Sequence, residues 1–223
     1  MRREMDWEAV SDGKLYTARD LVKAGCDDCR GCWQCCTGMG ESVILDPWDL
    51  FQLEQGTGQD FSGLLASALE LHVVDGVVLP NLRMAGPEER CGFLSQEGRC
   101  RIHPNRPGFC RMFPLGRIYQ EEGFHYFLQV QECPRQPKTK VRVSKWLDIP
   151  DLKSYETFVF SWHRLLKKVE ELLGQTQEPE AAKKLSLFLL QTFYLTPYDT
   201  AADFYGQFEA RRQAWENFTE TAL

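Results

Sequence analysis

Five of the chain's nine cysteines lie in one short run whose spacing suits a metal site. The run reads C-x2-C-x2-C-x2-C-C and contains Cys26, Cys29, Cys32, Cys35 and Cys36. A C-x2-C step lets a tight turn bring two sulfurs to one ion. A single cysteine often serves only as a small buried hydrophobe, but five at this spacing have no ordinary packing explanation. The run therefore predicts metal binding.

The remaining cysteines are dispersed along the chain, at Cys91, Cys100, Cys110 and Cys133. Dispersed cysteines near strand ends can supply the far ligands of sites whose near ligands lie in the run. Because the side chains of adjacent residues usually diverge, we expect Cys35 and Cys36 to serve different ions, or different irons of one cluster. The spacing is compatible with two interleaved four-ligand sites and with one polynuclear site.

The type of metal is open between zinc and iron. A structural zinc ion is commonly bound by four thiolates. Cys26, Cys29, Cys32 and Cys36 follow C-x2-C-x2-C-x3-C, the spacing of bacterial ferredoxins, and Cys133-Pro134 supplies a remote Cys-Pro. Thr37, however, stands where proline would follow the fourth cysteine. The cysteines therefore accommodate an iron–sulfur cluster or zinc, with iron slightly favoured.

Several flanking residues match as well as the cysteines. The pattern runs Cys29-x2-Cys32-x2-Cys35-Cys36, Cys91-Gly-Phe-Leu, Gly-Arg-Cys100-Arg-Ile-His, and Arg106-Pro-x2-Cys110-Arg-x-Phe-Pro. It resembles the YkgJ-type cysteine-cluster family, named for its CxxCxxCC motif and associated with zinc or iron chelation. The resemblance implies eight ligands: Cys29, Cys32, Cys35, Cys36, Cys91, Cys100, Cys110 and Cys133. Cys26 lies outside that pattern, so we expect it to be dispensable or a peripheral ligand.

Six arginines accompany the second cysteine region, with Glu97 as the acid among them: Arg90, Arg99, Arg101, Arg106, Arg111 and Arg117. Thiolates that share divalent ions leave net negative charge, which guanidinium groups can neutralise. A pocket for an anionic substrate is the other interpretation. We favour charge compensation, because metal sites commonly need such support around their ligands.

Composition places these cysteines in an ordinary globular chain. Of 223 residues, 43% are hydrophobic and 26% are charged. The N-terminal residues lack the apolar stretch of a signal peptide, and we expect a cytoplasmic protein with no membrane partner. In that reducing compartment cysteines indicate metal or catalysis rather than disulfides. The net charge of −6 argues against broad nucleic-acid binding.

The predicted fold is α+β. A small, irregular, metal-organised domain with short β-hairpins and helices (1–145) is followed by a C-terminal helical segment (146–223). We expect helices at 17–24, 47–56 and 61–69, a strand at 41–45, and hairpins at 73–78, 96–102 and 116–130. Residues 138–145 are expected to form an extended linker at the domain boundary. Beyond it, apolar residues at three- and four-residue steps predict three helices, near 155–173, 180–194 and 201–218.

These features predict a metal-binding protein whose metal has a structural or redox role. Two alternatives stay open. The first is a protein-modifying enzyme related to flagellin lysine N-methylase, which the family resemblance implies; enzymatic activity itself is left undecided. The second is metal storage or delivery, which would need exposed thiolates. The C-terminal helices could dock a protein partner.

Overall fold

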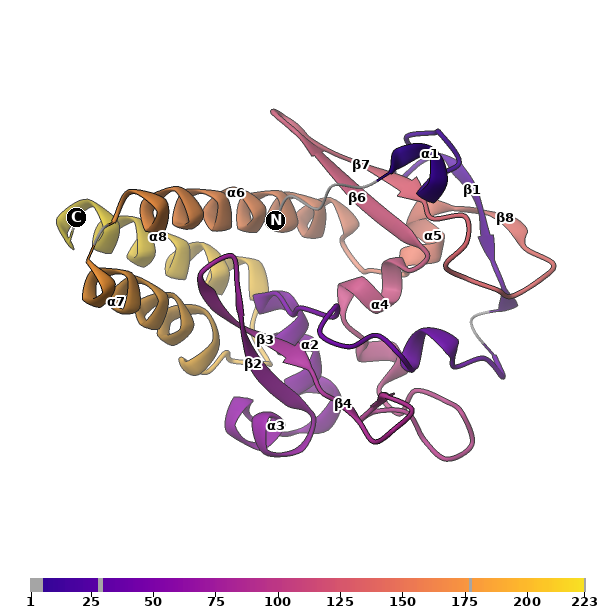
Figure 1. The fold of residues 1–223 in the computed structure, drawn as a ribbon, viewed down its shortest axis with the longest axis horizontal. Coiled ribbons are helices and arrows are strands. Elements are labelled where there is room, and N and C mark those ends of the chain that lie inside the picture. Colours follow the sequence, from indigo (N-terminus) through magenta and orange to yellow (C-terminus); the bar gives the residue numbers. More distant parts are fainter. Residues whose placement is uncertain (1–5, 28–29, 177, 223) are drawn as a thin grey trace.

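The chain is a mixed α+β protein in which short strand pairs and short helices precede three longer C-terminal helices (Figure 1). The computed structural model describes residues 6–27, 30–176 and 178–222. This architecture confirms the α+β class predicted from the sequence. Cys29 lies outside the described residues.

The helices are α1 (Trp7–Val10), α2 (Pro47–Thr57), α3 (Phe61–Ser67), α4 (Gly108–Met112), α5 (Val143–Leu147), α6 (Leu152–Gln175), α7 (Pro179–Leu190) and α8 (Phe204–Ala222). Two 3₁₀ turns, η2 (Gln34–Cys36) and η3 (His103–Asn105), lie in the cysteine regions, and a π turn, η4 (Gln191–Leu195), extends α7. The strands are β1 (Leu21–Gly25), β2 (Leu69–Val74), β3 (Val77–Leu82), β4 (Met84–Ala85), β5 (Arg90–Cys91), β6 (Leu115–Gln120), β7 (Gly123–Leu128) and β8 (Thr139–Arg142).

Local signals define the first long helix and two hairpins, as predicted. Asp46 accepts a hydrogen bond from the amide of Asp49, whose side chain in turn accepts one from the amide of Asp46, and Pro47 opens α2. The β2–β3 hairpin turns at Asp75 and Gly76, both of which have positive φ angles (51° and 83°). These angles match a two-residue turn of the primed type, which suits the twist of the strands. The β6–β7 hairpin is also confirmed.

The structure corrects two predictions that concern the edges of the cysteine region. Residues 17–24 were predicted to be helical, but Leu21–Gly25 is strand β1; the predicted linker at 138–145 contains strand β8 and most of α5. The two strands pair antiparallel, with Val22 opposite Val141. Val22 and Ala24 are buried while their neighbours are not, which is the alternation of a half-buried strand.

Two further strand predictions are only partly met. Residues 41–45 form a single bridge, between Ile44 and Asn81, rather than a strand. Residues 96–102 likewise contribute one bridge, from Cys100 to Leu94. These segments have too few partners for a regular ladder.

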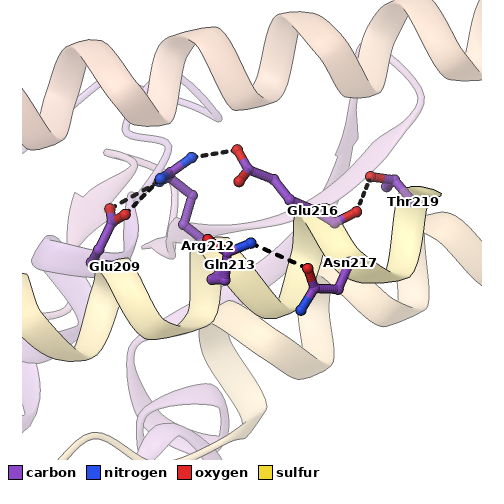
Figure 2. A network of polar contacts seen from close by, with 6 residues as sticks. All are labelled: Glu209, Arg212, Gln213, Glu216, Asn217 and Thr219. Atoms are coloured by element: carbon purple, nitrogen blue, oxygen red, sulfur yellow. Dashed lines mark hydrogen bonds and ion pairs between the residues drawn. The ribbon is translucent and has the colours of Figure 1, made fainter. Parts of the chain in front are cut away.

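The C-terminal helices pack along one another, as the predicted apolar stripes require (Figure 1). Aromatic rings join them: Phe158 of α6 meets Phe208 of α8 with ring centroids 4.7 Å apart, and Trp162 meets Phe193 of η4 at 5.0 Å. Along α8, Arg212 bridges Glu209 and Glu216 (Figure 2). Such partly exposed pairs each contribute only about 0.5 kcal/mol. Burial of the aromatic side chains, rather than these ion pairs, holds the helices together.

One hydrophobic core extends through both halves of the chain. Its buried residues run from Tyr16 to Trp215 and therefore lie on both sides of residue 145. Polar contacts also cross that position: the Tyr194 hydroxyl donates to the Leu45 carbonyl at 2.9 Å, and the Val78 amide donates to Ser186 Oγ at 3.1 Å. The division into 1–145 and 146–223 stays a prediction. Among the helices described, none combines the length and apolar character needed to cross a bilayer.

Candidate metal centre

Six cysteines line a single cavity of about 60 Å³. They come from the cysteine run, from β5 and the segment after it, and from α4: Cys32, Cys35, Cys36, Cys91, Cys100 and Cys110. Apolar side chains complete most of the wall, among them Val43, Phe93 and Ile102. None of the eight described cysteines is in a disulfide. The fold therefore gathers reduced sulfurs that lie up to 78 residues apart in sequence, from Cys32 to Cys110.

Short backbone contacts attach the cysteine run to β5. The amide of Gly38 donates to the Glu89 carbonyl at 3.1 Å, and Thr37 forms a bridge with Arg90. These contacts directly follow Cys36 and directly precede Cys91. The end of the run is therefore held beside the second group of cysteines.

A buried carboxylate orients the turn that carries Cys110. Asp49 is only 2% exposed, and its Oδ1 accepts a hydrogen bond from the amide of Gly108 at 2.6 Å. Burial raises the pKa of Asp49 to about 6, opposed by the amides of Gly108 and Asp46. In the sequence, Asp49 is simply the third residue of the helix predicted at 47–56. Its second role depends on a contact across 59 residues, for which the sequence gives no local signal.

Backbone amides also point at three of the sulfurs. Phe93 and Leu94 donate to Cys91, Ile102 donates to Cys100, and Arg135 donates to Cys133. In each case an amide two residues after the cysteine is used. Hydrogen bonds of this kind favour the thiolate over the thiol. The loops around these cysteines are thus shaped to support sulfur in its metal-binding form.

Burial has the opposite effect on the thiols when no cation is bound, because it favours the neutral thiol over the thiolate. It raises the pKa of the Cys91, Cys100 and Cys110 thiols, most strongly that of Cys110, where the nearby Cys91 and Cys35 add to the effect. The pKa of Cys35 is raised first by its hydrogen bond to Cys36 and then by burial. A bound cation would reverse this balance, because a coordinating thiol is deprotonated. The donor set fits a thiophilic ion.

Of the six arginines considered for charge compensation, Arg99 and Arg106 line the cavity. Both lower the pKa of the Cys100 thiol, although burial dominates there. The other four arginines donate hydrogen bonds to groups around the cavity. Arg90 donates to the Ser95 carbonyl, Arg101 donates to the Gly92 carbonyl, and Arg117 donates to the Tyr155 hydroxyl. Arg111 donates to the carbonyls of Pro104, Arg106 and Asp148. Most of the cluster therefore has a structural role.

Cys26 and Cys133 do not line the cavity and are more deeply buried, at 6% and 9% exposure. Cys26 directly follows β1, and both Cys26 and Cys32 contribute to raising the pKa of the Cys133 thiol, although burial dominates there. Cys26 also contributes to raising the pKa of Cys35, which lines the cavity. The described cysteines thus fall into a group around the cavity and a smaller group beside it. Within residues 6–27, 30–176 and 178–222, no three His, Cys, Asp or Glu side chains are already arranged to hold an ion. Ligation would need the sulfurs to close in.

Comparison with known families identifies the cysteine region. Residues 28–134 match the model of the CxxCxxCC family, described as a "putative zinc- or iron-chelating domain". Searches of curated proteins and of solved structures found no match. The matched range contains the cavity and every cysteine except Cys26. Residues 28–134 of this chain are therefore a domain of the CxxCxxCC, or YkgJ-type, cysteine-cluster family.

Proposed function

We propose that this protein binds iron or zinc through cysteine thiolates and that the metal has a structural or redox role. The proposed ligands are the eight cysteines of the family pattern: Cys29, Cys32, Cys35, Cys36, Cys91, Cys100, Cys110 and Cys133. The observation that carries this proposal is the cavity into which six described cysteines converge. An iron–sulfur cluster stays slightly favoured over zinc, on a ferredoxin-like spacing that would add Cys26 to these ligands.

The surroundings of the sulfurs support a resident ion over storage or delivery. Each described cysteine is buried or half-buried, whereas rapid exchange of metal needs exposed thiolates. Amides that donate to the sulfurs would further stabilise the thiolates of a permanent centre. Because the sulfurs must close in, metal binding would also contribute to folding. Reduced cysteines of this kind suit a cytoplasmic protein.

The polar side of the cavity is the observation that favours an enzyme as the second candidate. Arg99, His103 and Arg106 lie on that side and could bind an anionic substrate. Arg106, however, already donates to the carbonyl of His103 at 3.0 Å and contacts its ring. That contact makes Arg106 part of the wall. A structural or redox centre accounts for more of the lining residues.

Metal and sulfide analysis of the full chain, purified without oxygen, tests the proposal. We expect bound iron with acid-labile sulfide, or zinc without it; electron paramagnetic resonance before and after reduction would separate a redox from a structural role. Cys91→Ser and Cys100→Ser should each lose metal. Met84→Leu is the matched control, because it replaces another sulfur-bearing side chain of the same wall. A metal-free wild type, or cysteine variants that keep their metal, would overturn the proposal.

A further inference from the structure

Trp33 lies inside the cysteine run, between Cys32 and Cys35, which both line the cavity. Trp33 itself is not part of the cavity wall and is 46% exposed. The amide of Cys36 donates to the Trp33 carbonyl at 2.8 Å, at the start of the 3₁₀ turn η2. The indole is therefore carried by the same short turn that carries three of the cavity cysteines.

The six-membered ring of this indole lies against Gly98, in the loop that leads to Cys100. A Cβ on Gly98 would lie 2.6 Å from Trp33 Cε3 and 3.1 Å from Cζ3, and the three atoms nearest to that position all belong to Trp33. Gly98 is buried, although the two residues before it, Gln96 and Glu97, are exposed. The Trp33 ring therefore covers Gly98, and only a residue without a Cβ lets the ring come this close.

Hydrogen bonds make the loop around Gly98 stiff. The Gly98 amide donates to the Ser95 carbonyl at 3.1 Å, and the Ser95 amide donates to the Arg99 carbonyl at 2.9 Å. The Arg99 amide in turn donates to Ser95 Oγ at 3.2 Å, and Cys100 forms a bridge with Leu94. Arg99 and Cys100 both line the cavity. A displacement of this loop would therefore move two residues of the cavity wall together.

The contact between Trp33 and Gly98 joins two walls of the cavity that belong to different loops. The backbone contacts between the run and β5 involve Thr37 and Gly38, beyond the last cysteine of the run. They hold the end of the run, whereas the ring of Trp33 holds the turn itself. A packing contact made by one partly exposed ring can break while the rest of the fold stays intact, as in other local openings.

We propose that Trp33 and Gly98 form a clasp that controls the passage of metal ions and thiol reagents into and out of the cysteine cavity. With the ring on Gly98, the two walls are held together around a volume of about 60 Å³. That volume is well below the roughly 300–1,000 Å³ of pockets that bind small organic molecules, so a reagent larger than an ion enters only when the ring leaves Gly98. The part that concerns metal ions rests on the proposed function.

Alkylation of the full-length protein as purified without oxygen tests the clasp. N-ethylmaleimide labels free thiols, and mass spectrometry of the peptides gives a rate for each cysteine. Trp33→Ala removes the ring and Gly98→Ala displaces it, so both variants should label Cys91, Cys100 and Cys110 about tenfold faster than the wild type. A tenfold change corresponds to about 1.4 kcal/mol in the free energy of opening. Release of bound metal to excess EDTA should quicken by the same factor, with the metal content at saturation unchanged.

A matched glycine separates displacement of the ring from backbone strain. Gly86 has the same φ angle as Gly98, 74°, but a Cβ there meets nothing within 4 Å, so Gly86→Ala should label at the wild-type rate. Cys133 does not line the cavity and is the internal reference. Wild-type rates in Trp33→Ala, equal acceleration in Gly86→Ala, or equal acceleration at Cys133 would each overturn the clasp. A wild type without metal would refute the proposed function instead, and the labelling rates would still decide the clasp.

Discussion

The contact between Gly108 and Tyr155 provides a direct test of how the C-terminal helices support the cysteine region. Gly108 begins α4, which carries Cys110, and Tyr155 is a fully buried residue of α6. A Cβ at Gly108 would lie 2.0 Å from the Tyr155 hydroxyl oxygen and 3.2 Å from its Cζ. The hydroxyl has little freedom to move, because Arg117 donates to it at 2.8 Å. Gly108→Ala should therefore force apart α4 and α6.

The expected cost follows from two opposing effects. Overpacking a buried site costs about 1–3 kcal/mol. Replacing glycine by alanine stabilises the folded state by about 0.4–1 kcal/mol, because it reduces the conformational entropy of the unfolded chain. Gly108→Ala should thus destabilise the protein by roughly 1–2 kcal/mol.

A double-mutant cycle isolates the clash. Tyr155→Phe removes the hydroxyl and leaves Arg117 without that acceptor, which should cost about 1.5–3 kcal/mol. In the Tyr155→Phe background, Gly108→Ala should cost almost nothing, giving a coupling of roughly 1–2 kcal/mol. Urea unfolding followed by tryptophan fluorescence measures all four proteins. Gly174→Ala, where a Cβ meets nothing within 4 Å, is the control and should not destabilise.

A coupling below about 0.5 kcal/mol, the limit of additivity for independent sites, would refute this reasoning. It would mean that α4 and α6 relax apart without cost. The metal content of Gly108→Ala adds a second readout, since displacement of α4 also displaces Cys110. Unchanged stability with unchanged metal would show that Tyr155 does not position this turn.

Three further predictions concern titration, metal removal and a long-range hydrogen bond. Burial raises the pKa of Asp49 from 3.8 to about 6, so the folded state binds the Asp49 proton more tightly than the unfolded chain does. The free energy of unfolding should therefore fall as pH rises from about 4 to about 6. Asp49→Asn should flatten that part of a plot of urea midpoint against pH, and an unchanged slope would contradict this prediction. Chelation should expose amides of residues 30–38 and 90–101 to hydrogen exchange before those of α6 and α7; simultaneous exposure would refute the boundary at residue 145. Tyr194→Phe should cost about 1 kcal/mol by removing the bond to the Leu45 carbonyl, and a urea midpoint equal to that of the wild type would argue against that role.

The sequence predicted those elements whose signals are local. The start of α2 is encoded by Asp46 and Pro47, and the β2–β3 turn by Asp75 and Gly76, so both were found correctly. The stripe of α6 is likewise contained within one segment. Such signals need no knowledge of distant partners.

Elements that depend on distant partners were not predictable in this way. Leu21–Gly25 becomes a strand because β8, more than a hundred residues later, pairs with it. The segment carries no turn signal of its own that would have marked it as a strand. At the candidate site, cysteine spacing predicted metal binding, but neither the roles of Asp49 and Gly108 nor the effect of Cys26 on the pKa of the Cys133 thiol could be inferred from spacing.

The shared core has a consequence for the cysteines during synthesis of the chain. All nine cysteines leave the ribosome before Tyr155 and Trp215. Tyr155 and Trp215 are buried in the same hydrophobic core as residues of the cysteine region. Trp215 follows Cys133 by 82 residues (215 − 133), which at roughly 5–20 residues per second is about 4–16 s of synthesis. During that interval the thiols lack the packing that the C-terminal helices provide in the folded protein. They are then open to oxidants and to whichever thiophilic metal arrives first.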